Sequence, residues 1–398
     1  MTGLLVFTIA LVILLYHHLG YPLLLGLRAR RRPRRPTKSY SGDSGWPAVS
    51  LVISAYNEEE VLAAKLENAT ALNYPAGLLE IVVASDGSTD GTGAIAHGFA
   101  GRGVRLLEFS PNRGKNLVLN EVLPRLRSEI VVFTDANGMY HRDALRALIA
   151  PFADAAVGST CGELVYQNYN ENPIAEGYNR YWEFDQLQKR LESDAGTLLG
   201  ANGSIFAVRR ALCRPIPNDV CNDMVQPILV AAEGHLCVYE PRARSFEAGS
   251  RDLADELRRR SRIIGRGIRG IAFAWPTIVT HRAWAVGWEL VSRKGLRYLM
   301  PLWFLLLLAG SGLAGGPILG TFFWLQLAGY AAIPVAARLP EGRLSRLASP
   351  LVYFGIGNLA AIQGWGKVLA GSELGRWQTA ERPFEGESTN STPAAGLQ

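Results

Sequence analysis

The sequence has 398 residues, 48% of them apolar, and its formal net charge is +6. The apolar residues gather in long runs near both ends of the chain, with a mixed, charged region between them. This layout predicts a catalytic domain held between membrane segments. It argues against a transporter, because so few spans without inverted repeats leave little room for a transport path.

The four cysteines are too scattered for a metal site or a disulfide framework. They are Cys161, Cys213, Cys221 and Cys237, and no two form a CxxC pair. Such spacing fits neither a zinc site nor a set of disulfides. We therefore expect a reducing compartment and a packing role for these side chains.

The N-terminal segment reads as a membrane anchor. Residues 1–27 contain an apolar run long enough to cross a bilayer, which takes about 20 residues. No small-residue cleavage site follows, so we expect an anchor and not a removed signal peptide. Residues 28–38, RARRRPRRPTK, hold seven basic residues and no acidic one. By the positive-inside rule this linker lies in the cytoplasm. Without an aromatic or recognition-helix pattern it predicts no nucleic-acid partner.

The C-terminal region carries further apolar segments. Residues 281–300 mix aromatic and basic side chains, which predicts a helix in the membrane interface, with a solvated amphipathic helix as the alternative. Residues 301–371 contain two or three transmembrane or re-entrant segments, and the run 350–369 fits either description. Residues 372–398 form a tail. We expect an integral, multi-pass protein of a bacterial inner membrane, in contact with membrane lipid.

The middle region, residues 39–280, predicts an α/β domain. Apolar runs at Val49–Ala55, Glu80–Ser85, Val104–Phe109 and Ile130–Thr134 read as strands, and the segments between them have helical periodicity. This alternation predicts a mostly parallel central sheet with helices on both faces. Ligands bind at the carboxyl ends of the strands in such sheets.

Polar clusters follow three of these strands. They are Tyr56-Asn57-Glu58, Ser85-Asp86-Gly87-Ser88 and Asp135-Ala136-Asn137. Helix capping explains one such cluster more easily than three in register. Neither a Walker A pattern nor GxGxxG is present, so carboxylates and backbone would have to build a nucleotide site. Further motifs follow along the chain: Arg113-Gly114-Lys115-Asn116, Gly200-Ala201-Asn202-Gly203-Ser204, Asn222-Asp223-Met224 and Arg258-Arg259-Arg260-Ser261-Arg262.

Taken together, this ordered set resembles the family-2 glycosyltransferases, the inverting family that includes cellulose, chitin, hyaluronan and poly-N-acetylglucosamine synthases. The resemblance covers roughly residues 49–270 and the membrane layout. It implies a GT-A fold flanked by transmembrane helices, and a nucleotide-sugar donor.

The resemblance also implies which residues bind the donor. Tyr56, Asn57 and Glu58 would meet the base and ribose, and Asp86 would contact the base. Lys115 would face the donor phosphates, although a surface lysine is an equal alternative.

Asp135 and Asn137 stand where the family carries Asp-x-Asp. Carboxylates hold a hard divalent cation, Mg2+ or Mn2+, which would stabilise the departing diphosphate. Asn137 is neutral and offers only a carbonyl oxygen, so this chain departs from the usual ligand pair.

Two further motifs imply the catalytic groups. Asp223 occupies the position of the general base, with helix capping as the alternative role. Arg262 matches the arginine that neutralises the diphosphate, and Arg259 stands in the preceding motif position; a charged helix face would also explain both. Ile263 replaces a tryptophan of the processive synthases, which weakens the case for polymer synthesis. Gly203 would lie in a loop near the acceptor, unless that loop is a plain turn.

The predicted activity is inverting transfer of a sugar, most simply from a UDP-sugar, to a polysaccharide or lipid-linked acceptor at the cytoplasmic membrane face. Polysaccharide-export proteins are candidate partners. The alternative is a catalytically inactive, nucleotide-sugar-binding subunit of a membrane polysaccharide assembly.

Overall fold

The computed structural model describes residues 1–42, 44–167, 175–248, 252–340 and 342–376. The predicted tail, 372–398, lies outside the described residues from position 377 onward.

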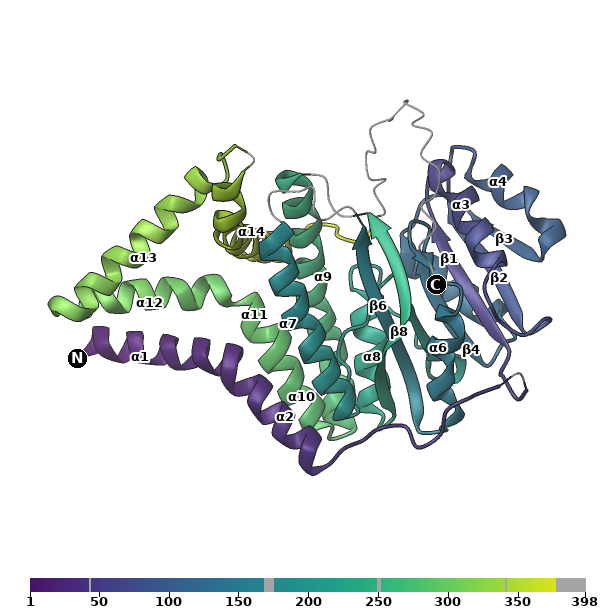
Figure 1. Ribbon diagram of the computed structural model, residues 1–398, viewed down its shortest axis with the longest axis horizontal. Coiled ribbons are helices and arrows are strands. Elements are labelled where there is room, and N and C mark those ends of the chain that lie inside the picture. Colours follow the sequence, from purple (N-terminus) through teal and green to yellow (C-terminus); the bar gives the residue numbers. More distant parts are fainter. Residues whose placement is uncertain (43, 168–174, 249–251, 341, 377–398) are drawn as a thin grey trace.

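Within these residues, eight strands form one mixed sheet in the order β3-β2-β1-β4-β7-β6-β8-β5 (Figure 1). The strands β1 to β4 pair in parallel, whereas β7 runs antiparallel to both of its neighbours, β4 and β6. On the other side, β8 is parallel to β6 and β5 is antiparallel to β8. The strands are β1 Val49–Ala55, β2 Leu79–Asp86, β3 Val104–Phe109, β4 Ile130–Asp135, β5 Met139–Tyr140, β6 Val157–Gln167, β7 Phe206–Arg209 and β8 Leu236–Ala248. The four predicted strands are thus present, each with ends within one residue of the prediction.

Helices cover both faces of the sheet because alternate side chains of each strand point to opposite faces. In β1, Leu51 and Ile53 belong to one core cluster and Val52 to the other. The first cluster packs under α3 (Glu59–Thr70), α4 (Thr92–Gly98) and α6 (Ala144–Ile149). The second packs under α5 (Lys115–Val122), α8 (Asn222–Ala232) and part of α9 (Leu253–Thr280). All seven residues of β1 are buried, as expected for a strand covered on both faces.

The strand register brings the polar clusters to one edge. Ala55 pairs with Ser85, and Ser54 pairs with Asp135, so the ends of β1, β2 and β4 are level. The predicted meeting of these clusters at the carboxyl edge of the sheet is therefore observed.

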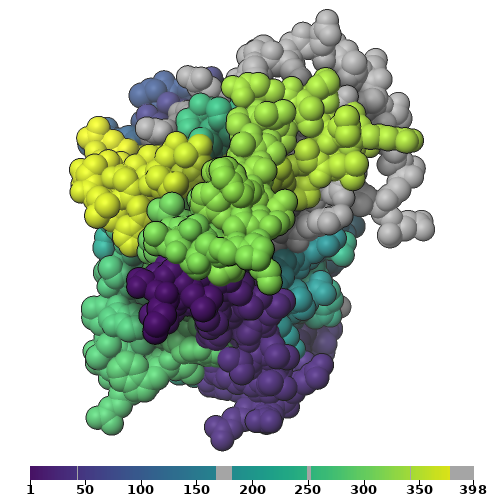
Figure 2. All heavy atoms as spheres, turned by 90° about the vertical axis from the view of Figure 1, so that its left-hand side faces the viewer, coloured from purple at the N-terminus to yellow at the C-terminus, as the bar shows by residue number. Residues whose placement is uncertain are grey.

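The remaining helices lie to one side of the sheet, with α7 alongside it and α1, α12 and α13 farthest from it (Figure 1). They are α1 Thr2–Leu15, α2 Tyr21–Arg31, α7 Ala175–Asp194, α10 Trp284–Leu290, α11 Leu296–Tyr298, α12 Met300–Ala314, α13 Gly316–Ala336 and α14 Arg343–Leu369. A π-helical turn joins α1 to α2, so that Thr2–Arg31 runs as one bent rod. Figure 2 shows the purple N-terminal helix beside the yellow-green helices of the C-terminal region.

By length and composition, two helices of the described chain could cross a membrane: Thr2–Arg31 and Gly316–Ala336. A third span results if the pair Trp284–Tyr298 and Met300–Ala314, bent by 65°, counts as one. The helix over the predicted run 350–369, α14, is not among these candidates. Exposed apolar side chains such as Ile318 (82% exposed) and Trp324 (67%) suit a lipid environment.

A close approach of two backbones joins α1, part of the first candidate span, to α12. A Cβ atom on Gly310 would lie 2.5 Å from the backbone nitrogen of Phe7 and 2.7 Å from its Cα. Only glycine permits this separation, and small residues at helix contacts are typical of membrane proteins.

Candidate active site

Asn57 connects the end of β1 to the loop after β2. It has a φ of 51°, a left-handed conformation that asparagine tolerates better than most residues. Its backbone N–H donates to Ser88 Oγ at 3.1 Å, and its Oδ1 accepts from the N–H of Thr89 at 2.8 Å. Tyr56 and Glu58 flank it, and both are partly exposed at the sheet edge. The three residues predicted to meet the nucleoside therefore lie together.

Asp86 holds the loop that precedes α5. It is fully buried, and its two oxygens accept the backbone N–H groups of Arg113 at 2.9 Å and Gly114 at 2.7 Å. The loop passes close by: a Cβ on Gly87, which has a φ of +73°, would lie 2.6 Å from the nitrogen of Asn112. In this structure Asp86 shapes the edge of the site, and its contact with a base stays a prediction.

Asp135 ends β4 and forms an ion pair with Lys115, the first residue of α5. The Asp135 side chain is 34% exposed and that of Lys115 is 15% exposed, so the pair lies at the surface of the site. Asn137 follows in the turn after β4 and is exposed. A donor phosphate at this edge would compete with Asp135 for the Lys115 ammonium.

Asp223 faces the same space from the other side. It lies in the first turn of α8, whose N-cap residue is Cys221, so the alternative role as the helix cap is wrong. A Cβ on Gly203 would lie 3.4 Å from Asp223 Oδ2 and 3.6 Å from Asp135 Oδ2. The two carboxylates therefore border the volume above Gly203. The backbone carbonyl of Asp223 accepts from the N–H of Ala201 at 2.8 Å, which fixes this loop to α8.

The surroundings of Asp223 suit a proton acceptor. Burial raises the pKa of its carboxyl group above the ordinary value, and the Asp135 carboxylate adds to that rise. The cations of Lys115 and Arg266 act in the opposite direction. A raised carboxyl pKa brings a base closer to neutral pH, where proton transfer is most effective.

Arg262 projects from α9 into the same region. Burial lowers the pKa of its guanidinium, and the like charge of Arg266 lowers it further, whereas the Asp135 carboxylate raises it. Arg266, which the sequence did not single out, donates to the carbonyl oxygen of Val220 at 3.1 Å through Nε. Two cations thus stand beside the two carboxylates.

Arg259, unlike Arg262, has its guanidinium nitrogens bonded to side chains of α9 and β6. Its Nε and one terminal nitrogen donate to Glu256 Oε2 at 3.2 and 2.9 Å, and its other terminal nitrogen donates to the Tyr166 hydroxyl at 3.1 Å. Ile263, in the position of the missing tryptophan, is 45% exposed. We therefore assign Arg259 a structural part in joining α9 to β6, and its contact with substrate remains a prediction.

Two further charged residues adjoin the site without any local motif. Glu247 lies near the end of β8, and burial together with the charge of Asp135 raises its pKa to about 7. Lys65 on α3 is fully buried and donates to Thr134 Oγ1 at 2.9 Å and to the carbonyl oxygen of Gly138. Burial lowers the Lys65 pKa to about 7. Neither residue follows a strand in a recognisable motif, so sequence reasoning could not find them.

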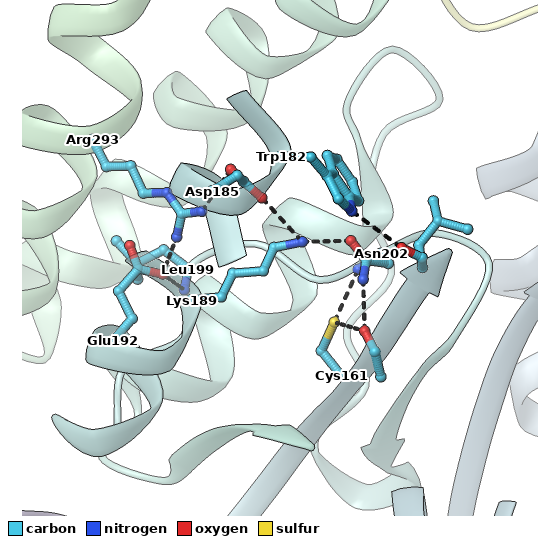
Figure 3. Close-up of polar contacts among 10 residues, drawn as sticks. Cys161, Trp182, Asp185, Lys189, Glu192, Leu199, Asn202 and Arg293 are labelled. Atoms are coloured by element: carbon cyan, nitrogen blue, oxygen red, sulfur yellow. Dashed lines mark hydrogen bonds and ion pairs between the residues drawn. The ribbon is translucent and has the colours of Figure 1, made fainter. Parts of the chain in front are cut away.

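A buried polar network supports the loop that carries Gly203 (Figure 3). Lys189 of α7 donates to Asn202 Oδ1 at 2.5 Å and lies 3.3 Å from Asp185 Oδ2. Asn202 donates from its side chain to the carbonyl oxygen of Gly162 at 2.6 Å, and from its backbone to Cys161 Sγ at 3.1 Å. Both polar ends of the Asn202 side chain are thus occupied.

The same network reaches the segment before α12. Arg293 is 1% exposed and pairs with Asp185 at 2.9 Å and with Glu192. The Arg293 side chain is therefore buried against α7 (Figure 3) and not directed to lipid headgroups. Arg28, in the predicted basic linker, pairs with Glu289 of α10.

Comparison with known proteins agrees with this geometry. A mannosyltransferase from Pyrobaculum calidifontis, PcManGT, solved in complex with GDP-Man and Mn2+, superposes with a TM-score of 0.66 at 24% identity. The match covers 92% of this chain and all of that chain. The fold is therefore that of the GT-A nucleotide-sugar transferases.

Sequence comparison gives the family. Residues 50–216 match the model of glycosyl transferase family 2. A beta-monoglucosyldiacylglycerol synthase of Nostoc sp. is 32% identical over 205 residues, 49% of this chain and 43% of that protein. A poly-beta-1,6-N-acetyl-D-glucosamine synthase of Staphylococcus epidermidis is 25% identical over 241 residues, 59% of this chain and 58% of that protein. The chain spans about half the length of these relatives. Residues 50–216 of this chain therefore form a glycosyl transferase family 2 domain.

The donor groups at this edge fit a divalent cation. Mg2+ is commonly held by one or two carboxylates together with substrate phosphates, so a preformed cage of side chains is unnecessary. Within the described residues, no group of three His, Cys, Asp or Glu side chains is placed to hold a metal by itself. Asp135 and the amide oxygen of Asn137 are hard oxygen donors in one turn. One hydroxyl oxygen close to this turn, Ser245 Oγ, is buried without a hydrogen-bond partner in the described chain.

Proposed function

We propose that this protein is an inverting glycosyltransferase that moves a sugar from a nucleoside diphosphate donor to a lipid or lipid-linked acceptor at the cytoplasmic face of a membrane. The observation that carries the proposal is the pair of carboxylates, Asp135 and Asp223, that border one space above Gly203. A glycosyl transfer needs one group that stabilises the leaving diphosphate and one base that accepts the proton of the attacking hydroxyl.

In the proposed reaction, Asp223 accepts the proton of an acceptor hydroxyl as its oxygen attacks the anomeric carbon. The bond from that carbon to the diphosphate breaks on the opposite face, and the diphosphate leaves with the electron pair. Lys115 and Arg262 stabilise its negative charge through their cationic groups. An α-linked donor would give a β-linked product.

Asp135 and Asn137 would hold a Mg2+ or Mn2+ ion beside the donor. Such a cation acts as a Lewis acid toward the phosphate oxygens. Tyr56, Asn57 and Glu58 would position the nucleoside at the end of β1.

The neighbouring helices support a lipid acceptor. Arg262 lies on α9, and the candidate spans of the chain lie on the far side of α7 and α9 from the sheet (Figure 1). A soluble acceptor would not require a site beside such helices. The curated relatives include both a glycolipid and a polysaccharide synthase by name, so the length of the product decides between the two.

The test is nucleotide release by the purified full-length chain in detergent. A panel of nucleotide sugars is supplied with and without Mn2+, together with diacylglycerol or prenyl-lipid acceptors. Asp223→Asn and Asp135→Ala are the test variants, and Asp255→Asn is the matched control. The control carboxylate is 44% exposed and pairs only weakly, at 3.4 Å, with Arg258.

Metal-dependent release from one donor, lost in both test variants and kept in the control, would support the mechanism and identify the donor. Release that persists in Asp223→Asn would refute the assignment of the base. Nucleotide binding without turnover under every condition would favour the inactive binding subunit. Mass spectrometry of the product separates a single added sugar from a polymer.

A further inference from the structure

The sequence leaves an unexplained feature at the cation site. The turn after β4 reads Asp135-Ala136-Asn137, so one of the two carboxylates that usually hold the ion is replaced by a neutral amide. A lost ligand charge weakens cation affinity unless another group supplies it.

The sheet brings a second carboxylate to this turn. The short strand β5 pairs antiparallel with β8, and Met139 faces Phe246 while Tyr140 faces Ser245. Continued by one residue, this register sets Gly138 opposite Glu247. In agreement, a Cβ on Gly138 would lie 3.4 Å from Glu247 Oε1 and 3.0 Å from Ser245 Oγ.

We propose that Glu247 is a ligand of the divalent cation and supplies the negative charge that Asn137 lacks. The inference rests on the proposed function, because the donor's diphosphate completes the coordination. Asp135 and Glu247 would then be the two carboxylates of the site, from strands more than 100 residues apart in the sequence. Hard oxygen donors would still surround Mg2+ or Mn2+, but the second carboxylate would come from β8 and not from the turn after β4.

Lys65 offers the competing role for Glu247. Its buried ammonium donates to Thr134 Oγ1 and to the carbonyl oxygen of Gly138, directly under the same turn. As a mere counterion of Lys65, Glu247 would contribute to stability and not to cation binding. The two roles differ in one measurable quantity, the affinity for Mn2+.

The experiment measures free Mn2+ by electron paramagnetic resonance as the full-length chain is titrated in detergent, with and without UDP or GDP. The variants are Glu247→Gln, Asn137→Asp and the two combined. The control is Glu240→Gln, on the same strand, whose carboxylate pairs with the exposed Arg242 at 2.8 Å. Thermal unfolding is recorded for each.

We expect Glu247→Gln to weaken Mn2+ binding about ten-fold or more, because ligand charge sets the affinity of such sites. Adding Asn137→Asp should restore most of the loss, since the turn then carries its own second carboxylate. Glu240→Gln should bind Mn2+ as the wild type does. If Glu247→Gln does not fold, the shorter Glu247→Asp should still bind Mn2+ more weakly than the wild type.

Wild-type affinity in a folded Glu247→Gln or Glu247→Asp variant overturns the inference and leaves the proposed function intact. No Mn2+ binding by a wild-type enzyme that still turns over its donor also overturns it. A wild type that neither binds Mn2+ nor turns over any donor removes the proposed function, and the inference with it.

Discussion

Replacing Lys189 with methionine tests how the loop that carries Gly203, part of the proposed active site, is held. The Lys189 side chain is 6% exposed, and its ammonium lies 3.3 Å from Asp185 Oδ2 and 2.5 Å from Asn202 Oδ1. At an effective dielectric constant of 20, the Lys189 ammonium and the Asp185 carboxylate, 3.3 Å apart, attract each other by roughly 5 kcal/mol. Removing one partner of a buried pair costs about 3–5 kcal/mol. Because Arg293 still pairs with Asp185 at 2.9 Å, we expect the lower end, about 3 kcal/mol.

This loss should lower the thermal unfolding midpoint by roughly 6–12 °C, at about 2–4 °C for each kcal/mol. The kcat should fall as well, because Asn202 precedes Gly203 in the loop between the two carboxylates. Nucleotide affinity should stay unchanged, since Asn57 lies at the end of another strand. Lys189→Arg keeps the charge, so its unfolding midpoint and its kcat should fall less than those of Lys189→Met. A Lys189→Met enzyme with the wild-type midpoint and kcat would refute the reasoning.

Three further predictions follow from individual contacts. Since burial raises the pKa of Asp223, and a base acts only when ionised, kcat/KM should fall as the pH decreases through that raised pKa. A pH profile in which Asp223→Asn keeps the acidic limb of the wild type would contradict this. Gly203→Ala puts a methyl group 3.4 Å from Asp223 Oδ2 and 3.6 Å from Asp135 Oδ2, which are ordinary contact distances. The kcat should therefore fall or the acceptor KM should rise, while the unfolding midpoint stays unchanged. A fully active variant would count against the site. Gly310→Ala forces a carbon to within 2.5 Å of the Phe7 nitrogen and should lower the midpoint by several degrees, roughly 1–3 kcal/mol for overpacking, whereas an unchanged midpoint would exclude this helix contact.

Much of the first half of the domain was predictable from local pattern. The apolar runs that became β1 to β4 are bounded by turn residues, and β1 and β4 are buried along almost their whole length, so composition marks their ends. Parallel pairing then requires the clusters at Asn57, Asp86 and Asp135 to share one edge, and the register confirms that they do. The local motif Asn222-Asp223-Met224 pointed to Asp223 from the sequence alone. These are local properties, and they can be read from neighbouring residues.

The second half depended on contacts between distant segments. The antiparallel insertion of β7 between β4 and β6 has no local signature, because strand direction depends on how the chain returns to the sheet. Arg293 sits in an aromatic and basic segment that predicted a membrane interface, yet its side chain is buried between Asp185 and Glu192. The sequence showed the charge of Arg293 but not its partners.

The sequence by itself determined the resemblance to family-2 glycosyltransferases, the order of the elements at the carboxyl edge of the sheet and the residues of the local motifs. Only the tertiary structure decided which polar groups meet: Lys115 with Asp135, Lys189 with Asn202, and Glu247 with the turn after β4. The physical reason is the distance along the chain over which each of these effects acts. Strand and turn preferences act over a few residues, whereas the position of a carboxylate relative to another depends on the register of strands that are more than 100 residues apart.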